Sequence, residues 1–276
     1  MIELSPSTYH YTPKRSREHR EREDLELRDA IEAVQVDFAR AGYRTVQHYL
    51  QRRGRRVGER RIRRVMKDFS LHAQIQRAFV RTTDSDHAHR VYPNRLPGKC
   101  VSGINQVWVS DLTYIRIENG FVYLAVILDL FSRKVIGWSI SRRIDAELAL
   151  GALRQAIQTR QPPAGCVHHS DRGVQYLCKD YVALLKANKF EISNSAKGNP
   201  YDNAFAESFM KTLKYDEVHL ANYETYLDVL ENLPSFIEEV YNEKRVHSGI
   251  DYLTPSELEE KIKLDPTLTS RFTLQL

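Results

Sequence analysis

Hydrophobic residues recur at helical intervals in the first quarter of the chain. Between residues 24 and 41 they are spaced by four, three and four positions, at Leu27, Ile31, Val34 and Phe38. This spacing predicts a helix with one buried face. Two shorter amphipathic segments follow, over residues 45–53 and 59–67, and Gly54 lies between them. A pair of amphipathic helices joined by a glycine-containing turn is typical of a helix-turn-helix.

Beyond residue 100 the pattern changes to short, strongly apolar segments separated by turn residues. Strands are predicted over residues 107–117, 121–130, 135–141, 166–170 and 191–193. Helices are predicted over residues 146–159, 179–188, 201–215, 223–231 and 234–243, with Pro234 in the first turn of the last one. Three consecutive strands followed by alternating helices and strands predict an α/β fold in which helices flank a mixed sheet.

The same patterns divide the chain into five segments. Residues 69–100 lose periodicity and contain Pro93, Pro97 and Gly98, so a linker is expected there. The predicted order is a polar tail (1–20), a small all-α helix-turn-helix domain (21–68), the linker (69–100), an α/β core (101–220) and a helical C-terminal extension (221–276).

The composition limits the class of protein. Hydrophobic residues make up 42% of the 276 positions, enough to build a core, which excludes a wholly disordered chain. No apolar run approaches the roughly 18 residues that a membrane helix requires, and no apolar segment follows the N-terminal charges as it does in a signal peptide. Three scattered cysteines are too few for a disulfide framework or a zinc site. We therefore expect a protein of a reducing compartment without a membrane partner.

Positive charge is concentrated near the N-terminus. Residues 1–100 contain nine more Lys and Arg than Asp and Glu, whereas the remaining residues contain four more acids than bases. On a helix over residues 59–67, four basic side chains lie opposite the apolar face. This arrangement predicts duplex DNA as the ligand, with a merely solvated basic surface as the alternative. The predicted DNA contacts in this domain are Arg44, Arg60, Arg61, Arg63, Arg64 and Lys67.

Three carboxylates occupy positions where a surface acid is not expected. Asp111 interrupts an apolar strand, Asp171 follows a short apolar strand, and Glu207 lies in a helix whose opposite face is apolar. Lys211 and Lys214 share the helical face of Glu207, at intervals of four and three residues. These two lysines are predicted to contact DNA phosphates. An ordinary ion pair between a glutamate and a lysine one turn later is the alternative.

Carboxylates from a central strand, a neighbouring strand end and a later helix suit hard cations such as Mg²⁺. Without cations, the three would repel one another strongly in a cleft of low dielectric constant. Two divalent ions about 3.5–4 Å apart would offset that repulsion and would clamp the attacking and leaving oxygens of a phosphodiester. Together with a DNA-binding domain, the acids favour a metal-dependent enzyme that acts on DNA.

The three acids also lie within motifs that resemble those of one protein family. The motifs are WVSDLTY at residues 108–114, HSDRGVQY at 169–176 and KGNPYDNAFAESF at 197–209. Thirty-five residues separate Asp171 from Glu207, which is the spacing of the last two acids in the DDE motif of that family. The segments YNEKRVHS (241–248) and YLTP (252–255) match the C-terminal signature of the same family. The pattern resembles the insertion-sequence transposases of the IS-three family, specifically their second-frame (OrfB) product with a retroviral-integrase-like (rve) DDE core. The resemblance extends over residues 21–260.

The resemblance implies a ribonuclease H-like fold and a DNA transposase activity. Asp111, Asp171 and Glu207 would be the catalytic acids and would ligate two Mg²⁺ ions, with Mn²⁺ able to substitute. The implied reaction nicks insertion-sequence ends and joins the 3′-hydroxyl to another phosphodiester. The implied partners are double-stranded DNA, as terminal repeats and as target, and the first-frame (OrfA) product or a fusion with it. The implied state is a homo-oligomer on DNA in the bacterial cytoplasm, associated with the nucleoid.

Two departures from related proteins accompany this resemblance. We expect a chain without the His/Cys zinc module of retroviral integrases and without the first-frame helix-turn-helix and zipper of the fused transposase. From the residues alone, two other functions stay open. A ribonuclease H-like nuclease without strand transfer would need only the acids, and a helix-turn-helix DNA-binding regulator would need only the basic helices.

Several further polar residues have both a structural and a functional interpretation. Asp129 is expected to stabilise the turn that follows it, and Asp202 to cap the helix that carries Glu207. The others are candidates to contact DNA, a phosphate or water, and are equally candidates for packed or anchoring side chains: His168, His169, Asn199, Tyr201, Arg245 and His247.

Overall fold

The computed structural model of the chain describes residues 17–71, 73, 90–196 and 203–276. The chain falls into two compact units, one on each side of the boundary between Gln76 and Arg77. In the described part of the chain, no helix is both long enough and apolar enough to cross a membrane.

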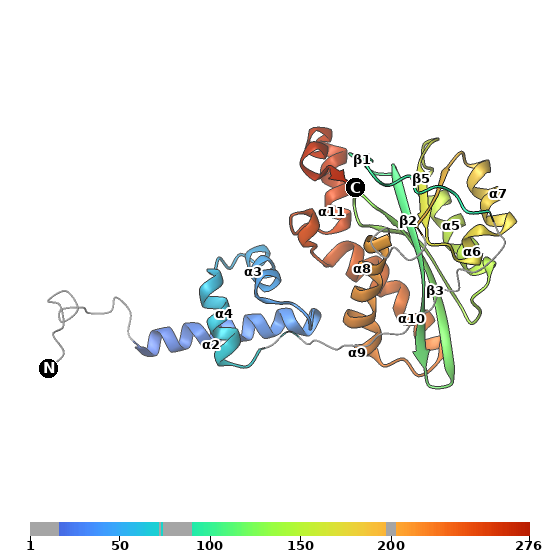
Figure 1. Ribbon diagram of the computed structural model, residues 1–276. Helices are drawn as coiled ribbons and strands as arrows, with labels where there is room; N and C mark the ends of the chain where they lie inside the picture. The colour runs from blue at the N-terminus through green and yellow to red at the C-terminus, as the bar shows by residue number, and fades with distance from the viewer. Residues whose placement is uncertain (1–16, 72, 74–89, 197–202) are drawn as a thin grey trace. The chain divides into compact units, whose positions relative to one another are not determined.

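The described part of the N-terminal unit contains three helices around one apolar core (Figure 1). They are α2 (Arg17–Asp37), α3 (Tyr43–Arg52) and α4 (Glu59–Asp68). Their buried faces contain the apolar stripe predicted from the sequence and the apolar residues of the two shorter helices, namely Leu27, Ile31, Val34, Val46, Leu50, Ile62 and Val65. The predicted helix-turn-helix is formed by α3 and α4. Gly54, in the turn between them, has a φ of 79°, a conformation that favours glycine.

The first helix starts earlier than the pattern predicts. It begins at Arg17, inside the segment 1–20 that was expected to be a polar tail, and it continues to Asp37. Residues 18–22 are exposed and belong to no apolar stripe. Arg and Glu nevertheless have high helix propensity, so the helix extends beyond its buried face. Residues 1–16 of the predicted tail lie outside the described part.

The C-terminal unit is built on a five-stranded mixed sheet (Figure 1). Its strands, in spatial order, are β4 (Val135–Ser141), β3 (Gly120–Asp129), β2 (Val107–Ile117), β5 (Val167–Ser170) and β6 (Glu191–Asn194). The strands β2, β3 and β4 form an antiparallel meander, whereas β5 is parallel to β2 and β6 is parallel to β5. This topology confirms the mixed α/β sheet predicted from the sequence and agrees with the expected ribonuclease H-like fold.

Helices cover both faces of this sheet. In chain order they are α5 (Ala146–Arg160), α6 (Val174–Leu177), α7 (Lys179–Ala187), α8 (Ala204–Leu213), η2 (Lys214–Val218), α9 (His219–Ala221), α10 (Tyr226–Ser235), η3 (Phe236–Lys244), η4 (Ser248–Ile250), α11 (Pro255–Leu264) and η5 (Pro266–Phe272). Of these, η2 and η3 are π-helices, and η4 and η5 are 3₁₀-helices.

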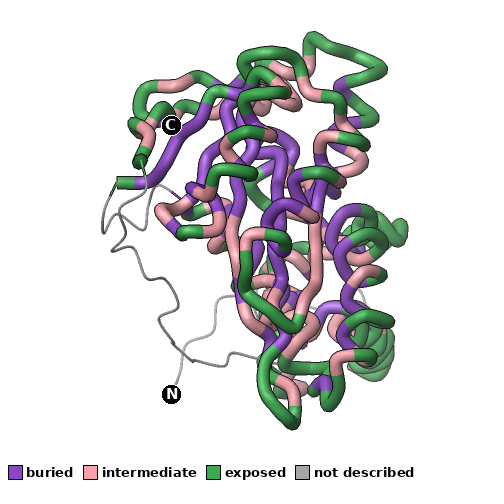
Figure 2. The backbone as a smooth tube through the Cα atoms, turned by 90° about the vertical axis from the view of Figure 1, so that its right-hand side faces the viewer, coloured by how far each residue is buried: buried purple, intermediate pink, exposed green. Residues whose placement is uncertain are grey.

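Side chains of the central strands alternate between two apolar cores, one on each face of the sheet. Trp108 and Ala125 belong to the core formed with α5 and α7, whereas Val109 and Leu124 belong to the core formed with α8 and α10. In Figure 2 the middle of the sheet is mostly buried (purple), whereas the segments around it include many exposed residues (green). Burial on both faces explains why these strands are nearly continuous in apolar residues.

Residues on both sides of the predicted α/β core (101–220) pack on that core. Its boundaries stay a prediction. On the linker side, the backbone N–H groups of Tyr92 and Arg95 donate to Asn194 Oδ1 and Ser193 Oγ, each at 2.9 Å. On the other side, apolar residues of the segment 221–276 share the core that α8 forms with the sheet. The helices at the C-terminus therefore cover the sheet directly.

Pro234 lies near the end of α10 and not in the first turn of a new helix, as the sequence analysis predicted. The helix α10 continues directly into the π-helix η3. Proline has no backbone N–H and its ring crowds the carbonyl one turn earlier, which disturbs α-helical hydrogen bonding. A local π-helical adjustment accommodates such a disturbance without ending the helix.

A second, two-stranded sheet joins the residues that precede the main sheet to the last residues of the chain. Its strands, β1 (Cys100–Val101) and β7 (Leu274–Gln275), are antiparallel. The pairing extends by two backbone hydrogen bonds: Gly98 N–H donates to the carbonyl oxygen of Leu276 at 2.8 Å, and Leu276 N–H donates to that of Lys99 at 3.1 Å. Residues 98–101, just before β2, are thus fastened to residues 274–276.

Candidate active site

Two of the predicted acids lie side by side on neighbouring parallel strands. The last residue pair between β2 and β5 is Val109 with His169. Asp111 and Asp171 each stand two residues beyond this pair, so the register of the strands brings them to adjacent positions. Asp111 is still within β2, whereas Asp171 is the first residue after β5.

A tight turn fixes the carboxylate of Asp171. The backbone N–H of Gly173 donates to Asp171 Oδ1 at 2.9 Å. A Cβ atom at Gly173 would lie 3.0 Å from this oxygen, tighter than nine in ten such contacts, so a larger residue would push on the carboxylate. Asn194 Nδ2 donates to the carbonyl oxygen of Asp171 at 3.2 Å, which holds the backbone of the turn to β6. The glycine of the HSDRGVQY motif therefore has a local structural role beside the acid.

The third predicted acid, Glu207, lies on α8, which packs against β2. Asn203 precedes this helix and donates from Nδ2 to the carbonyl oxygen of Ser110 at 3.2 Å. Because Ser110 is the neighbour of Asp111, this bond ties the start of α8 to the strand beside the first acid. Sequence reasoning missed Asn203, since an asparagine before a helix normally indicates a local cap, and here the side chain makes no such cap.

The three acids share one electrostatic environment. The pKa of Asp111 is raised to about 8, first by burial, then by the charge of Asp171 and more weakly by that of Glu207. The backbone N–H of Leu112, 2.9 Å from Asp111 Oδ1, and the ammonium of Lys214 lower this pKa without restoring it. The charged form of Asp111 is therefore disfavoured in the metal-free protein.

The chemistry of this donor set fits a divalent cation. Carboxylate oxygens are the ligands that Mg²⁺ and Mn²⁺ prefer. In the described part of the chain, no group of three or more His, Cys, Asp or Glu side chains is already arranged to hold a metal ion. Asp111 nevertheless interacts with both Asp171 and Glu207, and their mutual repulsion is an electrostatic cost that a bound cation would remove.

The two predicted phosphate-binding lysines of α8 and η2 differ in their surroundings. Lys211 Nζ is 3.9 Å from Glu207 Oε2 on an exposed helix face, which is the ordinary ion pair considered as the alternative. Lys214 is half-buried, with Nζ 4.6 Å from the centre of the Tyr114 ring. Burial lowers the pKa of Lys214, and the charge of Asp111 opposes that change. Lys214 is thus the predicted cation that lies beside Asp111.

Acidic residues of α2 pair with two of the predicted DNA-binding residues of α4. Arg61 Nη2 lies 2.9 Å from Asp24 Oδ1 and 3.2 Å from Glu23 Oε2. Arg64 Nη2 lies 2.7 Å from Asp24 Oδ2. These pairs could not be predicted from the sequence, because the acids are on a different helix. Arg61 and Arg64 therefore also hold α4 against α2.

The other predicted cations of this unit are more accessible. Arg63 is exposed, with its guanidinium 4.9 Å from the centre of the Tyr43 ring and 3.7 Å from Glu59. The guanidinium of Arg44 lies 5.5 Å from the centre of the same ring. The exposed residues Arg60 and Lys67 also lie on α4, on the side opposite its buried residues. The role of this surface in binding DNA stays a prediction.

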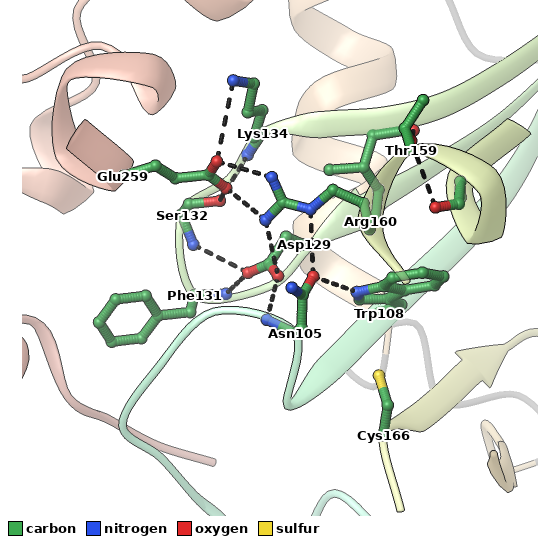
Figure 3. A network of polar contacts seen from close by, with 12 residues as sticks. Asn105, Trp108, Asp129, Phe131, Ser132, Lys134, Thr159, Arg160, Cys166 and Glu259 are labelled. Atoms are coloured by element: carbon green, nitrogen blue, oxygen red, sulfur yellow. Dashed lines mark hydrogen bonds and ion pairs between the residues drawn. The ribbon is translucent and has the colours of Figure 1, made fainter. Parts of the chain in front are cut away.

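Asp129 has the structural role expected from the sequence. It is completely buried, and its Oδ1 accepts hydrogen bonds from the backbone N–H groups of Phe131 (3.0 Å) and Ser132 (3.2 Å) in the following turn. Its Oδ2 accepts from Asn105 N–H at 2.5 Å and lies 3.8 Å from Arg160 (Figure 3). Burial raises the pKa of Asp129 to about 6. These contacts stabilise the turn and leave Asp129 apart from the three acids.

Both histidines of the HSDRGVQY motif region are buried and hydrogen-bonded. His168 Nε2 lies 2.9 Å from Tyr181 Oη, and burial lowers the pKa of His168 to about 3. The ring nitrogens of His169 lie 2.8 Å from Ser193 Oγ and 3.1 Å from Ser195 Oγ. The structure thus favours the packed interpretation for both side chains.

Candidates near the C-terminus are anchored as well. Arg245 forms an ion pair with Asp216 at 2.9 Å, and His247 is largely buried, with its ring 4.8 Å from that of Tyr241. These contacts support the anchoring interpretation of Arg245 and His247. The remaining candidates, Asn199, Tyr201 and Asp202, lie outside the described residues.

Sequence reasoning also missed a buried tyrosine beside the acids. Burial raises the pKa of Tyr176 well above its usual value, and the charges of Asp171 and Asp111 raise it further. Tyr176 was visible in the HSDRGVQY motif, but an aromatic residue after a turn indicates a core position as readily as a site residue. Its place next to two acids follows from the packing of α6.

Comparisons with known proteins match both units. Residues 102–200 and 188–255 match models of an integrase core domain, and residues 21–79 match a model of an HTH-like domain. The chain is 34% identical over 260 residues to the uncharacterized 31 kDa protein of insertion element IS600 from Shigella sonnei, covering 94% of this chain and 96% of that protein. It is 41% identical over 192 residues to the transposase InsF for insertion sequence IS3A from Escherichia coli (strain K12), covering 69% of this chain and 67% of that protein.

Among solved structures, the catalytic core domain of BIV integrase aligns with a TM-score of 0.44 and 20% identity, over 59% of this chain and 99% of that one. The matched domains define a protein with an integrase core and an attached HTH-like domain. Within that class, the chain belongs to the IS-three family of insertion-sequence transposases, which confirms the resemblance of its motifs.

Proposed function

We propose that this protein is a metal-dependent polynucleotidyl transferase that nicks insertion-sequence ends and joins the freed 3′-hydroxyl to another phosphodiester. The observation that carries the proposal is the electrostatic coupling of Asp111 to both Asp171 and Glu207. In this proposal, three acids from a strand, a strand end and a helix act together in a chain of the transposase family. Outside a catalytic or metal-binding site, such repulsion would be a cost without a function.

In this proposal the three acids are the metal ligands, and Asp111 is the one that interacts with both of the others. Two Mg²⁺ ions, or Mn²⁺ in their place, would supply the polarisation of the scissile phosphate and of the attacking hydroxyl. The turn at Gly173 holds Asp171, and the bond from Asn203 to Ser110 holds α8 beside Asp111. Lys214 and the more exposed Lys211 supply positive charge for the DNA phosphates near the acids.

The N-terminal unit is proposed to bind the terminal repeats of the insertion sequence. The matching HTH-like domain and the exposed cations of α4 support this assignment. Its partners are proposed to be end and target DNA, with the first-frame (OrfA) product present separately or as a fusion. Because one chain offers one set of acids and the reaction must hold two DNA ends, a homo-oligomer on DNA is also proposed. The reaction places the protein with the nucleoid in the bacterial cytoplasm.

Labelled DNA that carries the insertion-sequence ends tests this function. With Mg²⁺, the purified protein and its first-frame partner are expected to nick at the ends and to produce joined DNA. Cleavage without joining would indicate a ribonuclease H-like nuclease, and binding without either reaction would indicate a regulator. Both of those results would contradict the proposal.

A further inference from the structure

The acid Glu207 lies between two aromatic residues of its own helix. Phe205 and Phe209 each stand two residues away, which places both about 160° around the helix from Glu207 and about 40° from each other. Both rings therefore belong to the face that packs, while Glu207 belongs to the opposite one. Whatever holds these two rings also sets the rotation of α8 about its axis, and hence the direction in which Glu207 points.

Phe205 is held from the turn between β3 and β4. The guanidinium carbon of Arg133 lies 3.7 Å from the centre of the Phe205 ring. Burial lowers the pKa of Arg133 to about 10, so the side chain keeps its charge at neutral pH. Arg133 has a φ of 66°, a left-handed backbone conformation that is strained for a residue other than glycine. The surrounding structure must therefore hold this turn in place.

The network drawn in Figure 3 provides that support. Within it, Asp129 accepts hydrogen bonds from the backbone N–H groups of Phe131 and Ser132, just before Arg133. Ser132 Oγ donates to Glu259 of α11 at 2.7 Å, and Arg160 lies against Glu259 at 2.7 Å. The turn is thus fixed by α5 and α11 together.

Phe209 is held from the C-terminal signature. The ring of Tyr241, on η3, meets the ring of Phe209 edge-on with centroids 4.7 Å apart. The ring of His247 packs edge-on against the same tyrosine, with centroids 4.8 Å apart. Tyr241 and Phe209 are both almost fully buried, so neither ring can change position alone.

The two supports are joined to each other. Next to Tyr241, Asn242 accepts a hydrogen bond at Oδ1 from the backbone N–H of Val135 and donates from Nδ2 to its carbonyl oxygen, each at 2.9 Å. Val135 follows the turn that carries Arg133. The turn, the signature residues 241–247 and α8 therefore form a closed frame around Phe205 and Phe209.

We propose that Arg133 and Tyr241 are positioning residues for Glu207, which they orient by fixing the rotation of α8. This proposal rests on the function proposed above for Glu207. A rotation of 10° moves a side-chain atom at the rim of a helix, about 5–6 Å from the axis, by about 1 Å. A displacement of that size at a reacting centre can lower a rate by about 10²-fold. The C-terminal signature, which contains Tyr241, would thus help to orient Glu207 although it follows the acids in the sequence.

The test compares truncating and conservative variants of the full chain. Tyr241→Leu removes the ring that meets Phe209, and Arg133→Met removes the cation over Phe205, whereas Tyr241→Phe and Arg133→Lys keep the ring and the charge. Phe190→Leu is the matched control, because Phe190 is a buried aromatic residue that packs on Trp108, with centroids 5.1 Å apart, in the core on the other face of the sheet. Each variant is measured for Mn²⁺ binding without DNA by electron paramagnetic resonance, for thermal unfolding in EDTA, and for strand transfer.

We expect Tyr241→Leu and Arg133→Met to weaken Mn²⁺ binding and strand transfer by about 10–100-fold. The conservative variants should stay near wild type, and Phe190→Leu should lose thermal stability while binding Mn²⁺ normally. Arg133 is half-buried at a turn, so its loss opens no cavity in the core. Arg133→Met therefore tests the positioning role even if Tyr241→Leu fails to fold. Unchanged Mn²⁺ binding in Arg133→Met, or an equal loss in Phe190→Leu, would overturn the proposal.

Glu207→Gln, measured alongside, separates this proposal from the proposed function. Wild-type Mn²⁺ binding and strand transfer in Glu207→Gln would remove the function assigned to the acid itself. An inactive Glu207→Gln together with normal metal binding in the Arg133 and Tyr241 variants would leave that function standing and remove only the positioning role.

Discussion

Asp111 and Asp171 occupy adjacent positions on two parallel strands, although they lie far apart in the sequence. The register of β2 and β5 places each of them two residues beyond the pair Val109–His169. Parallel pairing of this kind leaves little freedom, because a slip by one residue would turn every side chain of a strand to the other face. The proximity of the acids is therefore built into the sheet, and the predictions below begin from it.

The first prediction is that replacing any one of the three acids removes nicking and strand transfer. Asp111→Asn, Asp171→Asn and Glu207→Gln should each lower nicking and strand transfer by at least about a thousandfold with Mg²⁺ or Mn²⁺, since several kcal/mol of transition-state stabilisation are lost. DNA binding, measured by fluorescence anisotropy, should be retained. Asp129→Asn is the control, and with its fold intact it should keep substantial activity. Strand transfer at the wild-type rate in any of the three acid variants would contradict the assignment.

A second prediction concerns the stability of the metal-free protein. The pKa of Asp111 is about 8 in the folded protein and 3.8 in a model compound, so its charged form disfavours the fold. The cost is absent below pH 3.8 and grows as the pH rises towards 8. Asp111→Asn should therefore raise the free energy of unfolding by at least about 1 kcal/mol at pH 8, and by less at pH 5. Urea denaturation in EDTA measures this difference. An equal effect at both pH values would show that charge is not the cause.

The third prediction is a loss of stability in acid caused by two buried histidines. Burial lowers the pKa of His168 and of His247 from 6.5 to about 3. Between these values the unfolded chain binds more protons than the folded one, so the stability that is fully present above pH 6.5 is lost as the pH falls. Each histidine should contribute up to about 1.4 kcal/mol per pH unit in this range.

Urea denaturation at pH values from 7 to 4 tests the histidine prediction. His168→Gln and His247→Gln should each reduce the slope of the unfolding free energy against pH, and the double variant should reduce it most. A double variant with the wild-type slope would assign the acid sensitivity to other groups.

The fourth prediction concerns the accessible cations of α4. Arg60→Ala and Lys67→Ala should each lower the slope of log K against log salt concentration for DNA binding by about 0.9, the value for one lost phosphate contact. Arg61→Ala should instead lower the thermal stability of the N-terminal unit, because Arg61 pairs with Glu23 and Asp24. Arg53→Ala serves as the control, since Arg53 is an exposed cation paired with Asp37 at 3.1 Å. Salt slopes that do not change in Arg60→Ala and Lys67→Ala would remove α4 from the DNA interface.

Local patterns in the sequence were sufficient to predict most of the elements. The strands β2 and β4 have the predicted bounds, because their apolar residues are flanked by clear turn residues. The helix α8 was predicted with Phe205 and Phe209 opposite Glu207, and those rings do belong to its packed face. These features depend on side chains only a few positions apart, which periodicity reports directly.

Features that depend on distant partners could not be predicted in this way. The pairing of Arg61 and Arg64 with Asp24 depends on how α2 meets α4, which no periodicity encodes. The bond from Asn203 to Ser110 depends likewise on the docking of a helix on a strand. Pro234 was placed wrongly, because a proline that begins a helix and one that a helix accommodates near its end look alike in sequence.

The pairing of β1 with β7 brings two distant segments of the C-terminal unit together. A hydrogen-bonded clasp holds residues 98–101 to residues 274–276, so the chain from Gly98 to Leu276 begins and ends at one place. A peptide tag attached after Leu276 would emerge beside Gly98. A short linker from Leu276 to Gly98 would also permit a circular permutant of residues 98–276 with its new ends in an exposed turn, such as the one between β2 and β3. In such a permutant, Asp111 and Asp171 would keep their register while the order of the strands in the sequence changed.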